Sequence, residues 1–166
     1  LAHIILHCRV SGQAEIWCLA SNLWKNKTGE DLPVASLGDI LASGLNNFLK
    51  LNDGGAKRLL RILIAESVKL IWSLRCAHRM GTREGMPIPT PMMKEAQQKW
   101  LYQINVRLKT DCIHIQTYKG KRQGALRSKV TQTWSNVLDH IKEGDLPSDW
   151  MKHGSGVLVG SAALTS

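Results

Sequence analysis

The longest regular pattern of hydrophobic positions runs from Arg58 to Cys76, in the stretch RLLRILIAESVKLIWSLRC. Its apolar residues recur at spacings of three, four and seven, the period of an α-helix with a wide apolar face. The residues of this face are Leu59, Leu60, Leu63, Ile64, Leu70, Ile71 and Leu74. Ile62 and Trp72 lie outside it, so we expect neighbouring elements to cover the helix on most sides. The pattern predicts a long central helix over about residues 57–80.

Two shorter helices are predicted before the central one. Residues 13–27 show helical spacing, with Ser11 offering an N-cap and Gly29 a C-terminal stop. Further along, Ser36 and Asp39 have the spacing of a capping box, which predicts the start of a short helix.

The second half of the chain begins after a proline-rich connector, residues 85–91 (GMPIPTP). Prolines at this density favour an extended conformation and end any preceding helix. The helical pattern then returns over residues 92–112 and again over 126–141. Between these two helices, Tyr118–Gly124 is expected to be an exposed loop.

The predicted fold class is therefore all-α, an irregular bundle of about five helices around the central one. We expect a single helical domain over residues 11–150, with lobes 11–81 and 90–143 joined by the connector. Residues 151–166 are rich in small residues and are predicted to form a flexible, extended tail.

The aromatic composition is uneven, with six Trp against one Phe and two Tyr. Indole rings of this number suit the gaps between helices, and each buried N–H then needs a hydrogen-bond acceptor. The four cysteines are scattered without a C-x-x-C pair, which fits a reducing compartment. No stretch of eighteen apolar residues is present, so we expect an intracellular protein, nuclear or cytoplasmic.

The net charge of +9 and the pI of about 9.7 indicate a polyanionic partner, with nucleic acid favoured over membrane. From Lys99 to Lys129 there are eight Lys or Arg and a single acid, Asp111. Such a stretch can neutralise several phosphates while Tyr118 stacks on a base. The alternative is a solvated face with no partner. The candidate nucleic-acid-binding residues are Arg107, Lys109, Tyr118, Lys119, Lys121, Arg122, Arg127 and Lys129.

The sequence shows no catalytic motif. Its thirteen acids are dispersed without a D-x-D cluster for a two-metal nuclease, and neither a G-x-S-x-G elbow nor a P-loop occurs. Glu66 lies among apolar residues, but an i,i+3 pair with Lys69 explains it better than a catalytic carboxylate. We therefore expect a protein that is not itself an enzyme.

Several blocks of the chain, in this order, resemble a known family: His3–Trp24, Arg58–Cys76, Lys99–Thr110, Lys121–Trp134, Asp145–Trp150 and Gly156–Gly160. Together they are similar to the C-terminal region of basidiomycete (mushroom-type) non-LTR retrotransposon polyproteins. In that family the region follows reverse transcriptase and ribonuclease H domains and a zinc-binding motif. The blocks are helical signatures rather than catalytic motifs.

The resemblance implies that residues 1–10 are the end of that zinc-binding motif. His3-x4-Cys8 matches its second half, whereas Ala2 stands where the family has an acidic residue. A structural zinc site needs four ligands, so zinc is expected only if two upstream cysteines, or His7 and another chain, complete the site.

The resemblance also implies an accessory role beside the upstream reverse transcriptase domains, in which the chain binds RNA or DNA non-specifically. The alternatives are a helical packing or homo-oligomerisation module, and an inactive remnant of the retroelement with no nucleic-acid role.

Overall fold

A computed structural model of the chain describes residues 2–8, 12–34, 36–44, 53–83, 93–138, 150–152 and 159. Within these residues the fold is all-α, as predicted, and the only β-type pairing is an isolated antiparallel bridge between Leu138 and Val159. The helices are η1 (His3–His7, a single π-helical turn), α1 (Gln13–Thr28), α2 (Leu37–Ala42), α3 (Gly54–Arg83), α4 (Met93–Thr117) and α5 (Gly120–Trp134).

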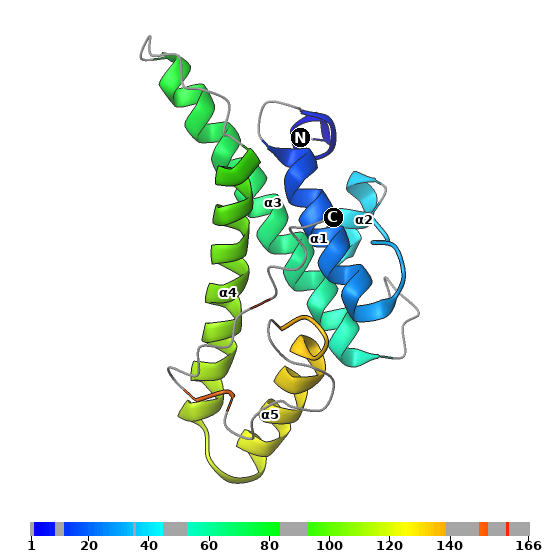
Figure 1. The fold of residues 1–166 in the computed structure, drawn as a ribbon, viewed down its shortest axis with the longest axis vertical. Coiled ribbons are helices and arrows are strands. Elements are labelled where there is room, and N and C mark those ends of the chain that lie inside the picture. The colour runs from blue at the N-terminus through cyan, green and yellow to red at the C-terminus, as the bar shows by residue number, and fades with distance from the viewer. Residues whose placement is uncertain are drawn as a thin grey trace.

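The long helix α3 is the centre of the bundle, and α1, α4, α5 and η1 all pack against it (Figure 1). Helix α4 runs back along α3 in the opposite direction and extends past it. Helix α5 then turns back from the far end of α4 toward the start of α3, so that α4 and α5 form a hairpin at one end of the molecule.

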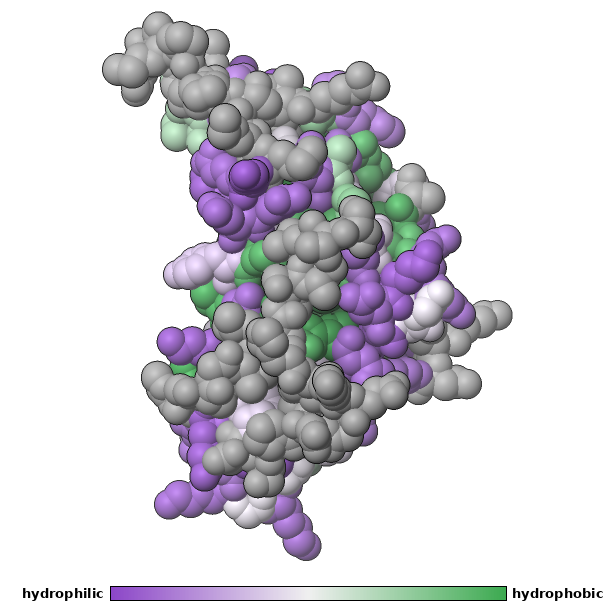
Figure 2. Space-filling view, in the orientation of Figure 1, coloured by the Kyte–Doolittle hydropathy of each residue, from purple (hydrophilic) through white to green (hydrophobic). Residues whose placement is uncertain are grey.

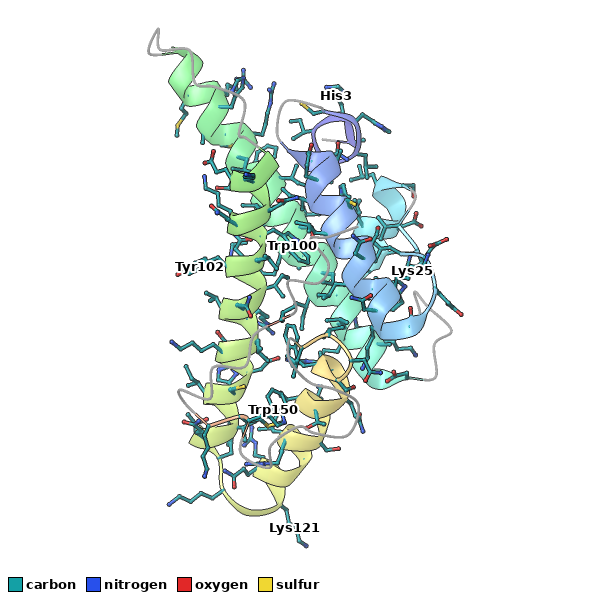
Figure 3. The ribbon with its side chains drawn as sticks, in the orientation of Figure 1. His3, Lys25, Trp100, Tyr102, Lys121 and Trp150 are labelled. Atoms are coloured by element: carbon teal, nitrogen blue, oxygen red, sulfur yellow. The ribbon has the colours of Figure 1, made fainter. Side chains whose placement is uncertain are left out.

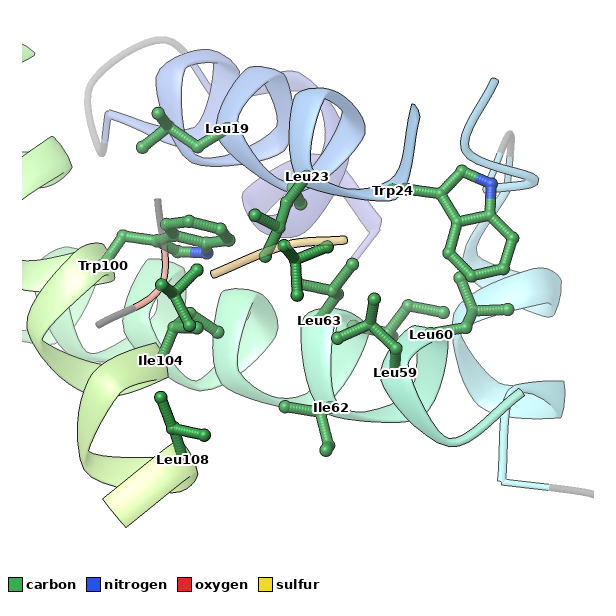
Figure 4. Packing of buried hydrophobic residues seen from close by; sticks show 14 of the residues in the cluster. Leu19, Leu23, Trp24, Leu59, Leu60, Ile62, Leu63, Trp100, Ile104 and Leu108 are labelled. Atoms are coloured by element: carbon green, nitrogen blue, oxygen red, sulfur yellow. The ribbon is translucent and has the colours of Figure 1, made fainter. Parts of the chain in front are cut away.

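The core is built from the apolar faces of α1, α3 and α4 (Figure 4). Leu59, Leu63 and Ile71 of α3 are fully buried, and Ile62 is covered as expected. The prediction for Trp72 is wrong, because 47% of its surface is exposed. It lies on the same side of α3 as the exposed Ala65 and Lys69, whereas Ile71 and Leu74 next to it are buried.

Helix α1 starts at Gln13, as predicted, but its N-cap residue differs from the prediction. The N-cap is Gly12, in the left-handed region at φ 64°, and Ser11 lies outside the described residues. A Cβ at Gly12 would lie 2.9 Å from the Cβ of Ala96, so glycine also permits the close approach of α4. The predicted stop is confirmed: Gly29, at φ 77°, donates its N–H to the Lys25 carbonyl.

The capping box before α2 is confirmed on both sides. The Asp39 N–H donates to the Ser36 hydroxyl at 3.2 Å, and the Ser36 N–H donates to the Asp39 carboxylate at 2.7 Å. At the start of α3, the Asp53 carboxylate accepts the Gly55 N–H at 2.7 Å. These contacts satisfy N–H groups that have no partner within their helices.

The predicted loop at Tyr118–Gly124 and the predicted last helix are both corrected. Only Tyr118 and Lys119 are non-helical, and α5 begins at Gly120 rather than near Leu126. The first turns of α5 have no buried apolar face, so hydrophobic spacing could not reveal them. At its other end α5 stops at Trp134, before Val137 and Leu138. Ile141 and the connector 85–91 lie outside the described residues.

A lysine from α1 binds the C-terminus of α5. The Lys27 ammonium donates to the Gln132 carbonyl at 2.7 Å, the Ser135 carbonyl at 3.1 Å and the Ser135 hydroxyl at 2.7 Å. A cation at this position complements the helix dipole. Burial lowers the pKa of Lys27, while the nearby Asp53 carboxylate acts in the opposite direction.

Tryptophan N–H groups tie the helices together. Trp100 of α4 donates to the buried Ser67 hydroxyl of α3 at 2.9 Å, and Trp17 donates to the Ile5 carbonyl at 2.9 Å. Trp134 donates to Asp111 at 2.8 Å. The expectation that each buried indole has an acceptor is not met at Trp24, whose buried N–H has none among the described residues.

The predicted tail is described only at Met151, Lys152 and Val159. Met151 and Val159 are buried, whereas Lys152 is exposed. The Val159 N–H donates to the Asn105 side-chain carbonyl at 2.7 Å, and Gln116 donates to the Met151 carbonyl at 3.2 Å. These two contacts hold Met151 and Val159 against α4, and the other residues of the predicted tail lie outside the described residues.

Candidate nucleic-acid interface

The basic stretch predicted from the sequence forms the hairpin of α4 and α5. The two helices are joined by Tyr118 and Lys119 alone, so the turn is short. The Gln123 side chain of α5 donates to the Ile115 carbonyl of α4 at 3.3 Å, which satisfies a carbonyl in the last turn of α4. Gly120, at φ 64°, provides the left-handed residue that lets α5 start directly after this turn.

The single acid of this stretch is removed from the surface. Asp111 is only 3% exposed and accepts the Arg58 guanidinium of α3 at 2.6 Å and the Trp134 indole N–H of α5 at 2.8 Å. Arg58 also donates to the Thr133 hydroxyl at 3.1 Å. The carboxylate therefore joins three helices, and between Lys99 and Lys129 the charged side chains that the hairpin exposes to solvent are all cations.

The three cations nearest the turn are Lys119, Lys121 and Arg122, which we call the basic tip. All are exposed at the free end of the hairpin, where Figure 3 labels Lys121 and Figure 2 shows protruding hydrophilic side chains. Lys119 is the N-cap residue of α5 but makes no side-chain capping bond, and the first turn of α5 contains no acid. These positive charges lie at the positive end of the helix dipole, an unfavourable arrangement without an anion.

Tyr118 and Arg122 form a stacked pair at the basic tip. The guanidinium carbon of Arg122 lies over the Tyr118 ring, 4.2 Å from its centroid. A cation over an aromatic face is attracted to it, so the pair holds both side chains in place. Tyr118 is half-buried and Arg122 is exposed, so the pair presents the guanidinium outward.

The structure separates the other predicted residues. Lys109 and Lys129 are exposed, and Lys129 lies seven residues after Arg122, which places both on one side of α5. Arg127, five residues after Arg122, projects from the opposite side. Arg107 is partly buried, with 41% of its side chain exposed and its Nε 4.0 Å from the Asp111 carboxylate, so part of its charge is already matched.

One feature of this surface was missed in the sequence. Tyr102, Val106 and Ile113 of α4 are exposed, Tyr102 by 72% of its surface, and Figure 3 shows Tyr102 pointing away from the bundle. With Lys109 they follow the spacing of one helix face, which we call the outer stripe of α4. The sequence did contain this information, because these positions fall between the buried positions of the same helix and are therefore expected to face solvent.

The proposed half-site for zinc stays a prediction. His3 is exposed on η1 and Cys8 is buried directly after it. Among the residues that the structure describes, no three potential ligands (His, Cys, Asp or Glu) lie close enough to share a metal ion. The predicted pair of Glu66 and Lys69 is confirmed at 3.6 Å. Glu66 therefore has an ordinary structural partner.

Comparison of the chain with protein-family models, with curated proteins and with solved structures finds no significant match. The described helices include none with the length and apolar character needed to cross a bilayer. The chemistry of the surface is therefore the basis for a proposed function.

Proposed function

We propose that the chain is a non-catalytic domain that binds RNA or DNA without sequence choice through the hairpin of α4 and α5. The observation that carries the proposal is the burial of Asp111 beneath a surface whose exposed charges are Lys109, Lys119, Lys121 and Arg122 among others. Cations gathered in this way attract a polyanion, and binding releases the counterions condensed on its phosphates.

The start of α5 supports an anionic partner in particular. The first N–H groups of a helix have no acceptor within it and point outward, as a phosphate-binding end does. At α5 no capping side chain occupies them, and Lys121 and Arg122 flank them. A phosphate at the basic tip would relieve the repulsion between these cations and the helix dipole.

Phosphate contacts of this type give affinity without reading bases. Flexible, exposed lysines carry no directional pattern of donors that would select one base edge. We therefore propose non-specific binding, which suits a non-catalytic domain that holds a template or target for an enzyme.

The salt dependence of binding tests the proposal, with Lys121→Glu as the variant. We expect fluorescence anisotropy with a labelled oligonucleotide to show weaker binding by the variant at low salt. The slope of log K against log salt should become less negative by about 1, since one phosphate contact is lost.

Lys94→Glu is the matched control. Lys94 is exposed and is the second residue of α4, as Lys121 is the second residue of α5, so both changes alter net charge and helix dipole equally. Lys94 lies at the end of α4 far from the basic tip, so equal loss of affinity in the two variants would show that net charge alone matters and that the basic tip is not the site. Absence of binding to RNA and DNA by the unaltered protein at low salt would refute the proposal.

A second candidate function is assembly through apolar surface. Trp72 and Met80 are exposed on one side of α3, eight residues apart, away from its covered part. Ultracentrifugation discriminates the two functions. A monomer that binds nucleic acid argues against assembly, whereas an oligomer that Trp72→Ser dissociates and that does not bind nucleic acid supports it.

The resemblance to retrotransposon polyproteins supports the same function, although it identifies no further binding residue. In such a polyprotein the domain would follow a reverse transcriptase, whose RNA or DNA would be the polyanion. The residues that precede Leu1 in the parent protein would test this part of the proposal.

A further inference from the structure

The outer stripe of α4 combines exposed apolar surface with a positive charge. Tyr102, Val106 and Ile113 expose apolar surface, and Lys109 lies between them on the same side. The stripe spans about 16 Å along the helix axis, from the rise of an α-helix over eleven residues. Because α4 runs toward the basic tip, the stripe leads to it (Figure 1).

We propose that the outer stripe and the Tyr118–Arg122 pair bind a single-stranded nucleic acid, with bases stacked on Tyr102 and on the Arg122 guanidinium. This inference rests on the function proposed above and names its substrate class. Phosphates would contact Lys109, Lys119 and Lys121, while Val106 and Ile113 would contact the faces of unpaired bases.

A single strand fits this surface better than a duplex. The faces of paired bases are covered by their neighbours in the stack, so exposed aromatic and apolar side chains gain nothing from a duplex surface. An unpaired strand offers both a charged backbone and free base faces, and stacking on aromatic and Arg side chains is sequence-tolerant. A second copy of the chain is a poor binding partner for this surface, because two such hairpins would bring like charges together.

Three probes separate stacking from charge: an oligothymidine of about 16 nucleotides, an abasic oligomer of the same length, and a duplex of the same length. At constant low salt we expect the oligothymidine to bind about five- to a hundredfold tighter than the abasic oligomer, from one or two stacked bases. The abasic oligomer reports the phosphate contacts alone.

Tyr102→Ala and Arg122→Lys test the two stacking positions. Both keep the net charge, and Tyr102 is too exposed for its loss to affect folding. Each should weaken oligothymidine binding about fivefold or more while leaving the abasic oligomer unchanged. Trp72→Ala is the control, because Trp72 is also an exposed aromatic residue but belongs to α3, outside the stripe.

Several results would overturn the inference. Equal affinity for oligothymidine and the abasic oligomer, or tighter binding of the duplex, would refute stacking while the proposed function stands on its salt dependence. If Tyr102→Ala instead converts an oligomer to a monomer, the stripe is a contact between copies of the chain. If none of the three probes binds, the proposed function itself fails.

Discussion

The Asp111 carboxylate is a buried charge on which three helices meet. The carboxylate, 3% exposed, accepts Arg58 of α3 at 2.6 Å and Trp134 of α5 at 2.8 Å. Asp111→Asn keeps the shape of the side chain but removes its negative charge. The Arg58 guanidinium, whose side chain is only 20% exposed, is then left without a counter-charge. The Asn amide also has a single acceptor oxygen, so either Arg58 or Trp134 would face its NH2 group, which only donates.

The expected loss is about 3 kcal/mol of unfolding free energy, the lower end of the range for breaking a buried ion pair, because Arg58 retains some solvent. For a chain of this length that corresponds to a fall in Tm of roughly 6–12 °C. Urea denaturation followed by circular dichroism measures it, and the midpoint should fall by roughly 1–2 M.

Glu95→Gln is the matched control for Asp111→Asn. It breaks the pair of Glu95 with Lys99, whose N···O distance is also 2.6 Å but whose side chains are about half exposed. Such surface pairs contribute about 0–1 kcal/mol. If the two variants lose the same stability, burial of the carboxylate is not what makes its pair important, and the reasoning is wrong.

A double-mutant cycle isolates the interaction itself. Arg58→Met alone leaves the Asp111 carboxylate buried without its cation, and Arg58→Met combined with Asp111→Leu replaces the pair by apolar side chains. The double variant should be less destabilised than the sum of the single ones, because neither charge then remains buried alone. Additive losses would show that the two side chains act independently.

Two further changes test close packing and thiol chemistry. In Gly55→Ala the new Cβ would lie against the Gln132 carbonyl oxygen of α5, so the unfolding free energy should fall by about 1–3 kcal/mol. Gly54→Ala is the control, because a Cβ there has nothing within 4 Å and should be neutral or stabilising. Equal urea midpoints for the two variants would contradict this reasoning. Burial, together with the adjacent carboxylate, raises the pKa of Cys112 to about 11, so at pH 8 its alkylation by iodoacetamide should be at least about a hundredfold slower than that of the exposed Cys18, and should accelerate with pH up to about 11. Peptide mass spectrometry measures both rates, and similar rates would refute the assignment.

Helices with a wide buried face were predictable from the sequence. The apolar spacing of α1, α3 and α4 is a local property of the chain, and it located each of them to within a few residues. Helix α5 was misplaced because its first turns are exposed and polar, and because Gly120 and Gly124 suggested a loop. Local spacing carries no signal where no face is buried.

The role of Asp111 was only half visible in the sequence. It occupies the same helix face as the buried Ile104, Leu108 and Ile115, so its burial could have been inferred from the register of α4. Its partner could not, because Arg58 is 53 residues away and one of many cations in the chain. Only the packing of α3 against α4 and α5 selects it.

The sequence by itself determined the helical class, the basic charge and the scarcity of acids between Lys99 and Lys129, because these depend on composition and local spacing. The tertiary structure alone decided which partners the buried charges have. It brings Arg58 of α3 and Trp134 of α5 to the Asp111 carboxylate, and Lys27 of α1 to the end of α5. The physical reason is that these partners are distant in the chain, so only the packing of the helices brings them together.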